Sequence, residues 1–325
     1  MRIHLQSSLG SANFPLTQEV WDEAAPRAPD IAGGHELSFG HTREAFEAGM
    51  RDAEVLISQT SALVPGLPAA PKLKLIYVTS AGLEKLAPFK WLPEGVPLLN
   101  NRGTHAAKAG EFGLMALLML VNWMPYLATA QREGRWDQKH GTVLAGHHVV
   151  VVGMGTLGGS IARHAKDFGM RITGVRTRAE PHPLCERVVA TADLDAVLPE
   201  AEFLVLAAPL TPATRGLLSR ERIALLPKGA GIVNVGRGAL ADQDALLDAL
   251  DSGHLGGAVL DVFEQEPIPP GHRLWTTRNL VITPHTSADD PTTYNARSLD
   301  IFFENLRAFR DGKPLPNRFD VARGY

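Results

Sequence analysis

Residues 146–159 read GHHVVVVGMGTLGG, an apolar run followed by three glycines with the spacing G-x-G-x-x-G. The run His148–Val152 predicts a fully buried strand, and the residues from Leu157 to Gly169 predict a helix. A strand, a glycine turn and a helix in this order are typical of an α/β fold with a parallel sheet that binds a dinucleotide. The alternative is the same strand–turn–helix without a ligand.

Each glycine of this turn has a role in dinucleotide binding. Gly153 permits the tight turn, Gly155 lets the main chain approach a pyrophosphate, and Gly158 lets the helix pack closely on the strand. N–H groups at the start of the helix, around Thr156 and Leu157, then face the phosphates, and the helix dipole favours the negative charge of these groups.

The next predicted strand ends at Arg176, 18 residues after Gly158. An acidic residue there would receive the adenosine ribose hydroxyls of NAD. The chain instead has Arg176, Thr177 and Arg178, and guanidinium groups match a phosphate where a carboxylate would repel it. The sequence therefore favours NADP(H) and leaves NAD(H) possible. The alternative is that both arginines are solvated loop residues.

Apolar runs alternate with helical patterns along most of the 325 residues, which predicts two α/β domains with parallel sheets. A final helical pattern after residue 290 is expected to return to the N-terminal domain. We expect a discontinuous domain of residues 1–100 and 288–325 and a dinucleotide-binding domain of residues 101–287. The predicted strands are Arg2–Gln6, Glu54–Ser58, Leu73–Val78, His148–Val152, Arg171–Val175, Arg187–Val189, Phe203–Ala207, Gly231–Val235, Gly257–Asp261 and Leu280–Thr283.

Composition excludes several classes of protein. A formal charge of −3 with mixed signs disfavours binding to nucleic acid or to an anionic membrane. The single cysteine, Cys185, excludes an internal disulfide and a cysteine-based metal site, and it fits a cytoplasmic protein. We expect no metal and no signal peptide. The apolar stretch Phe112–Ala130 contains Asn122 and Pro125 and predicts a buried helix.

Charged residues follow three of the predicted strands, at the edge where open α/β sheets bind ligands. Arg237 follows one strand between Gly236 and Gly238, whose lack of side chains leaves the guanidinium room to point into a cleft. Asp261 ends the next strand with Glu266 five residues on, and His285 follows the third. Reduction of a 2-keto acid needs a hydride at the carbonyl carbon and a proton at its oxygen. Histidine suits the proton donor because its ordinary pKa of about 6.5 lies near working pH. Alone, each residue could be a surface or turn residue.

The ordered motifs VTSAGLEKL, VVVGMGTLGGSIARHAKDFGM, LAAPLTPATRGLL, IVNVGRGALADQDALLDAL, AVLDVFEQEP and VITPH resemble those of the D-isomer-specific 2-hydroxyacid dehydrogenases over nearly the whole chain. The resemblance implies a Rossmann-type cofactor domain inserted into a flavodoxin-like, discontinuous substrate domain, both doubly wound. It implies NAD(P)-dependent hydride transfer between a small 2-keto acid, such as glyoxylate or hydroxypyruvate, and a D-2-hydroxy acid.

The resemblance also assigns roles to single residues. Arg237, Glu266 and His285 would be catalytic: Arg237 holds the substrate carboxylate, and Glu266 keeps the imidazolium of His285 charged. The amides of Ala81 and Gly82 would receive the substrate carboxylate. Four further residues would contact the cofactor. Asp261 would hold the nicotinamide carboxamide, Pro209 and Thr211 would border the adenine side, and Val235 is the fourth.

The resemblance further implies a homodimer, formed by a helical segment of about residues 104–136. Some relatives act as corepressors, so the alternative function is a dinucleotide-sensing binding protein without turnover. Formate oxidation is disfavoured, because relatives with that activity carry an amide where this chain has Glu266.

Overall fold

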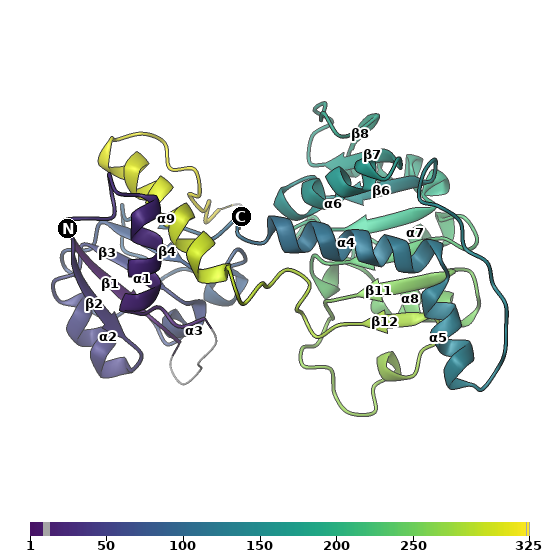
Figure 1. Cartoon of the computed structure of the whole chain (residues 1–325), viewed down its shortest axis with the longest axis horizontal. Helices are drawn as coiled ribbons and strands as arrows, with labels where there is room; N and C mark the ends of the chain where they lie inside the picture. Colours follow the sequence, from purple (N-terminus) through teal and green to yellow (C-terminus); the bar gives the residue numbers. More distant parts are fainter. Residues whose placement is uncertain (9–13, 323, 325) are drawn as a thin grey trace. The chain divides into compact units, whose positions relative to one another are not determined.

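The computed structural model of the chain describes residues 1–8, 14–322 and 324. It divides into two compact units, Met1–Thr104 with Asp290–Tyr325 (the first unit) and His105–Asp289 (the second unit). The sequence predicts domain divisions at residues 100/101 and 287/288, and the roles given to these domains stay predictions. Each unit contains one parallel sheet between helices, so the predicted α/β class is confirmed (Figure 1).

The first unit is built on a five-stranded parallel sheet in the order β2-β1-β3-β4-β5. This is the flavodoxin-like order. The predicted strands β1, β3 and β4 are present, whereas β2 and β5 were not predicted. The strands are β1 (Arg2–Gln6), β2 (Glu36–Gly40), β3 (Val55–Ser58), β4 (Leu75–Val78) and β5 (Leu98–Leu99).

Helices cover both faces of the first sheet: α1 (Gln18–Ala24), α2 (Arg43–Met50), α3 (Thr60–Leu63) and α9 (Tyr294–Arg310). Leu5 and Ile57 point to the face where Trp21 of α1 and Phe302 of α9 pack. Alternate strand residues point to the other face, which α2 and α3 cover. The C-terminal helix α9 therefore completes a core that begins at residue 3.

The second unit is built on a seven-stranded parallel sheet in the order β12-β11-β10-β9-β6-β7-β8. The strand order reverses between β6 and β9, and ligands of open α/β sheets bind at such a point, beyond the carboxyl ends of the strands. The strands are β6 (His148–Val152), β7 (Arg171–Arg176), β8 (Arg187–Ala190), β9 (Phe203–Leu206), β10 (Gly231–Asn234), β11 (Gly257–Leu260) and β12 (Leu280–Ile282).

Five helices flank the second sheet: α4 (Ala106–Val121), α5 (Met124–Arg132), α6 (Thr156–Asp167), α7 (Arg220–Leu225) and α8 (Gln243–Asp251). Val149 and Val151 face α4 and α6, whereas Val150 and Val152 face the side of α7 and α8. Burial on both faces explains the uninterrupted valine run of β6.

The long helical segment of the second unit breaks earlier than its proline suggests. α4 ends at Val121, and Trp123 adopts a left-handed conformation with φ +55° before α5 begins. Pro125 lies in the first turn of α5, where the missing N–H group costs nothing. Within the described residues no single helix has the length and apolar content to cross a membrane; α4 and α5 reach that threshold only as a pair bent by 64°.

Candidate active site

The three glycines between β6 and α6 have three different neighbourhoods. Gly153 has a φ of +94°, and a Cβ there would lie 2.5 Å from the backbone nitrogen of Ala208. A Cβ on Gly158 would lie 2.0 Å from the carbonyl oxygen of Gly153, so this glycine lets α6 pack against the turn. A Cβ on Gly155 would meet no atom within 4 Å. Packing inside the protein therefore explains Gly153 and Gly158 but not Gly155.

The open surroundings of Gly155 fit a turn that a dinucleotide approaches. Gly155 precedes α6 and has no side chain that could cap the helix. The first N–H groups of α6, including those of Thr156 and Leu157, have no partner within the helix and carry its partial positive charge. These groups match the pyrophosphate of a dinucleotide in charge and hydrogen-bonding capacity.

A carboxylate lies beside Arg176 and Arg178, the two arginines at the end of β7, which is the strand after α6. Arg176 is the last residue of β7. Glu180 lies 4.0 Å from Nη1 of Arg176 and 3.4 Å from Nε of Arg178. Sequence analysis found two guanidinium groups without a carboxylate here and missed Glu180. A glutamate four positions after Arg176 was the available signal, and the turn at Arg178–Glu180 brings it close.

The loops that follow β10 and β11 touch each other. A Cβ on Gly238 would lie 1.9 Å from the carbonyl carbon of Phe263, so glycine is required by this contact. Asn234 fixes the first loop, because its amide donates to the carbonyl of Arg237 (3.1 Å) and its oxygen accepts from the N–H of Gly236 (3.1 Å). Sequence analysis explained the flanking glycines by room for the guanidinium, but at Gly238 the cause is the contact with the second loop.

Glu266 and His285 form a hydrogen-bonded pair in the second unit. Nδ1 of His285 lies 2.7 Å from Oε2 of Glu266, and Oε1 accepts the N–H of Phe263 at 2.9 Å. The His285 side chain is 50% exposed and that of Glu266 is 35% exposed. With Nδ1 directed at the carboxylate, Nε2 is the ring nitrogen that can meet another molecule.

At Glu266, hydrogen bonds and nearby positive charges have a larger effect on the pKa than burial does. Burial raises the pKa of this carboxyl, but hydrogen bonds from His285 and from the N–H of Phe263, with the positive charges of His285 and Arg237, outweigh it and lower the pKa below its ordinary value. Glu266 is therefore ionised at neutral pH. The charge of Arg237 is the smallest of these contributions and links Arg237 to the His285–Glu266 pair.

Asp261 fixes the segment that carries His285. This carboxylate is 1% exposed and accepts the hydroxyl of Thr283 (2.6 Å) and the N–H groups of Thr286 (2.8 Å) and Ser287 (3.0 Å). Its main-chain carbonyl accepts the N–H of His285 (2.9 Å), whose φ is +53°. The sequence predicts only a cofactor contact for Asp261 and not this second role, which depends on the left-handed backbone conformation of His285.

Residues 114–287 match the family model of the NAD binding domain of D-isomer specific 2-hydroxyacid dehydrogenases. The match includes the glycine turn and the strand-end residues Arg237, Asp261, Glu266 and His285. The chain belongs to the D-isomer-specific 2-hydroxyacid dehydrogenase family. Membership places it among the NAD(P)-dependent oxidoreductases and confirms the resemblance seen in the sequence motifs.

Relatives within this dehydrogenase family extend the match to both units. The D-3-phosphoglycerate dehydrogenase of Methanocaldococcus jannaschii is 33% identical over 84% of this chain and 53% of its own length. The glyoxylate reductase of Korarchaeum cryptofilum is 32% identical over 82% of this chain and 83% of its own length. The chain thus spans about half the length of the former relative and most of the latter.

The D-isomer specific 2-hydroxyacid dehydrogenase of Xanthobacter autotrophicus Py2, solved in complex with NADPH and MES, has the same fold. The two sequences are 30% identical, and the superposition has a TM-score of 0.81. The match covers 99% of this chain and 100% of the related chain. This similarity supports the Rossmann-type assignment of the second unit.

The remaining predicted site residues of this dehydrogenase lie in two loops and one strand end. Ala81 and Gly82 follow β4 in the first unit, where the Ala81 carbonyl accepts the Asn100 amide at 2.8 Å. Beyond β9, the Thr214 hydroxyl donates to the Pro209 carbonyl (2.7 Å) and accepts the Thr211 N–H (2.8 Å). This self-contained turn accounts for Pro209 and Thr211 without a ligand, so their adenine contact stays a prediction.

Val235 follows β10 directly. Its side chain is buried at 3% exposure, and its N–H donates to the carbonyl of Leu206 at 3.0 Å. The N–H is therefore used within the sheet, and any contact with the cofactor would fall to its carbonyl oxygen. That contact also stays a prediction.

Proposed function

We propose that this chain reduces a small 2-keto acid, of the size of glyoxylate or hydroxypyruvate, to the D-2-hydroxy acid with NADPH as the hydride donor. The observation that carries the proposal is the His285–Glu266 pair near Arg237, at the carboxyl edge of the second sheet. The glyoxylate reductase among the relatives and the NADPH in the related structure support the substrate class and the cofactor.

His285 acts as the proton donor. NADPH, when bound, supplies the hydride to the carbonyl carbon. Glu266 holds Nδ1 of His285, so the imidazolium donates the proton on Nε2 to the carbonyl oxygen. The ionised carboxylate of Glu266 stabilises the imidazolium before the transfer. In the oxidative direction the neutral imidazole accepts the same proton.

Arg237 binds the substrate carboxylate and polarises the carbonyl group. Its backbone is fixed by Asn234 and by the contact of Gly238 with Phe263, so the guanidinium starts from a rigid loop. A fixed positive charge stabilises the developing alkoxide without reorganising during the reaction. We assign the substrate domain to the first unit, where the amides of Ala81 and Gly82 receive the carboxylate.

The cofactor preference rests on Arg176 and Arg178. Two guanidinium groups at the end of β7 provide charge-assisted hydrogen bonds for a 2′-phosphate, which NADH lacks. We expect the Arg176→Glu variant to shift the ratio of kcat/KM for NADPH over NADH toward NADH. An unchanged ratio would remove the cofactor assignment.

The deciding experiment mixes the purified protein with NADPH or NADH and a panel of 2-keto acids. Loss of absorbance at the reduced-nicotinamide band, with the D-hydroxy acid as product, supports the proposal. Cofactor binding without turnover of any acid would instead indicate a dinucleotide-sensing protein. The variant His285→Ala should bind NADPH as the wild type does and turn over at least a hundredfold more slowly.

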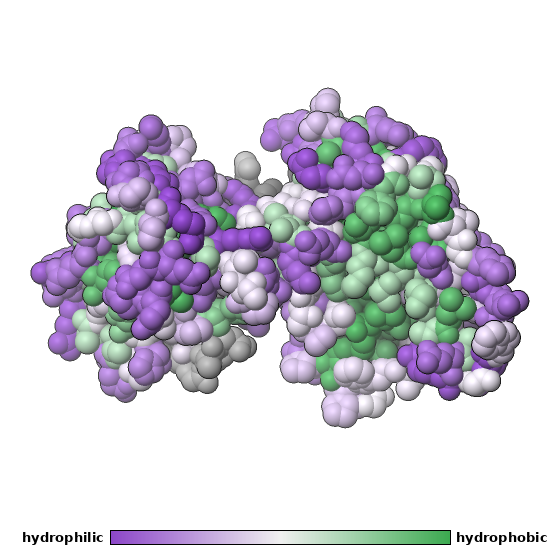
Figure 2. Space-filling view, viewed as in Figure 1, coloured by the Kyte–Doolittle hydropathy of each residue, from purple (hydrophilic) through white to green (hydrophobic). Residues whose placement is uncertain are grey.

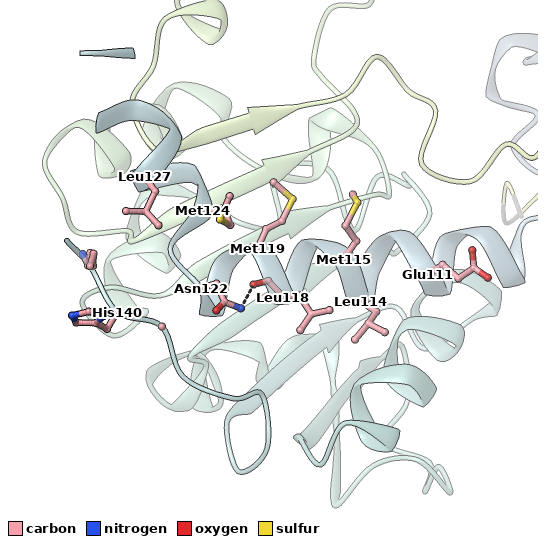
Figure 3. A pocket seen from close by; sticks show the side chains of 11 residues that line it. Glu111, Leu114, Met115, Leu118, Met119, Asn122, Met124, Leu127 and His140 are labelled. Carbon is pink, nitrogen blue, oxygen red and sulfur yellow. Dashed lines mark hydrogen bonds between the residues drawn. The ribbon is translucent and has the colours of Figure 1, made fainter. Parts of the chain in front are cut away.

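We further propose that a second copy of the chain packs against the apolar face of α4 and α5. Green, hydrophobic residues gather on this face of the second unit (Figure 2). Leu114 and Leu118 lie on one side of α4 and Met115 and Met119 on the other (Figure 3). Met115 and Met124 are 42% and 45% exposed. The face is lined by Leu114, Met115, Leu118, Met119, Met124 and Leu127.

Exposed apolar faces of this kind are typical of subunit interfaces, and the two-fold homodimer is the commonest assembly. Trp136, four residues after the end of α5, is 94% exposed and is a further large apolar side chain without cover in the single chain. Size-exclusion chromatography with light scattering should give twice the chain mass of 35.0 kDa. The variant Met115→Glu should give a monomer that keeps its circular dichroism, and a monomeric wild type would refute the assignment.

A further inference from the structure

The loop after β7 contains a carboxylate between the two arginines of the proposed NADPH site. Glu180 lies 3.4 Å from Nε of Arg178 and 4.0 Å from Nη1 of Arg176. The Glu180 N–H donates to the Arg178 carbonyl at 2.8 Å, so a tight turn keeps the carboxylate close to both guanidinium groups. The side chain of Glu180 is 56% exposed and can rotate away without disturbing a core.

The surroundings of this carboxylate are otherwise positive. The pKa of His182 is lowered by its burial and then by the charges of Arg176 and Arg163, which places Arg163 of α6 near the same loop. Glu180 itself pairs with the guanidinium groups of Arg176 and Arg178. An anion that binds to Arg176 and Arg178 meets the charge of Glu180 within a few ångströms.

We propose that Glu180 is a specificity-determining residue that competes with the 2′-phosphate of NADPH for Arg176 and Arg178. This inference rests on the proposed NADPH preference. A phosphate monoester brings a charge of about −1.5 to −2 at pH 7, and a carboxylate about 5 Å away in a solvent-exposed site repels it. Glu180 therefore reduces the selectivity for NADPH over NADH, while a ligand without the phosphate is unaffected.

The test compares wild type with E180Q in binding of two adenosine fragments, 2′,5′-ADP and 5′-ADP, by calorimetry. E180Q removes the charge and keeps the size of the side chain. We expect the Kd for 2′,5′-ADP to fall about three- to tenfold and the Kd for 5′-ADP to stay unchanged. The gain should shrink between about 50 mM and 500 mM salt, because exposed charges are screened.

Glu200 provides a matched control. Its side chain is also 56% exposed, and it pairs with Arg187 at 3.7 Å, away from Arg176 and Arg178. E200Q changes the net charge of the protein by the same amount and should leave both Kd values unchanged. If E180Q and E200Q both bound 2′,5′-ADP more tightly by the same factor, the net charge of the protein would explain the effect and the proposal would be overturned.

The outcomes separate this inference from the proposed function. If wild type prefers 2′,5′-ADP and E180Q binds it no tighter, the role of Glu180 is refuted while the cofactor preference stands. Weaker binding by E180Q would show that Glu180 organises the arginines, which also refutes competition. If wild type binds both fragments equally, the NADPH preference itself fails and the role of Glu180 falls with it.

Discussion

Replacing Glu266 by glutamine tests the proposed mechanism most directly. The carboxylate has two tasks: Oε2 accepts from Nδ1 of His285 and Oε1 accepts the N–H of Phe263. An amide of the same size has one acceptor oxygen and no charge. The variant E266Q therefore loses one of the two hydrogen bonds and the charge that stabilises the imidazolium.

The size of the effect follows from the exposure of the pair. Two unit charges about 4 Å apart attract by about 1 kcal/mol in water and about 4 kcal/mol at an effective dielectric of 20. Side chains that are 50% and 35% exposed belong near the lower value. A loss of about 1.4 kcal/mol in the transition state lowers kcat/KM about tenfold.

The assay measures keto-acid reduction by NADPH as a function of pH for wild type, E266Q and E264Q. Glu264 lies two residues before Glu266 in the same loop and accepts the N–H of Gln243 at 3.5 Å, so it is a matched control. We expect E264Q to keep wild-type kinetics. E266Q should lose about tenfold in kcat/KM, because the amide carries no charge to stabilise the imidazolium.

Two results would refute this reasoning. Wild-type kcat/KM in E266Q at every pH would mean that the carboxylate does not support proton transfer. An equal loss in E264Q and E266Q would mean that the loop as a whole, and not the charge on His285, carries the effect.

Three further predictions concern the turn, the buried aspartate and acid stability. Gly158→Ala should lower Tm, because its Cβ would lie 2.0 Å from the carbonyl oxygen of Gly153 and overpacking costs about 1–3 kcal/mol. Gly155→Ala should keep the wild-type Tm and weaken NADPH binding. Equal melting curves of the two variants in scanning fluorimetry would contradict this prediction. Asp261→Asn should lower kcat tenfold or more, since an amide cannot accept all three hydrogen bonds that fix residues 283–287; Thr283→Val, which removes one, should cost less, and the reverse order would refute the role. The folded state lowers the pKa of Glu266, so its stabilisation is present above the ordinary value near 4.5 and is lost as pH falls through the lowered value; the Tm difference between wild type and E266Q should therefore shrink in acid, and a difference that grows below pH 4.5 would reverse the sign.

Most of the fold could be predicted because both sheets are parallel and buried. Fully apolar strands such as β6 and β9 are continuous runs, and their predicted bounds agree with the structure to within one residue. β2 was missed because its residues Glu36–Gly40 are largely solvent-accessible at a sheet edge, and β5 because it has only two residues. The break between α4 and α5 was missed because Trp123 adopts a left-handed conformation without a glycine.

The part of the candidate site that lies at the ends of strands could be predicted from the sequence. Arg237, Asp261 and His285 each follow a parallel strand, so their shared edge follows from topology alone. The multiple hydrogen bonds of Asp261 could not be predicted, because they depend on the left-handed backbone conformation of His285. Glu180 was missed for the same kind of reason, since a turn and not a strand brings it to the arginines.

The contact of Gly238 with Phe263 means that the loops bearing Arg237 and Glu266 move as one piece. Any side chain at 238 would push the two loops apart, and with them the backbones that carry Arg237 and Glu266. Variants made elsewhere around these two loops should therefore keep Gly238, because its replacement disturbs the supports of both charged residues at once.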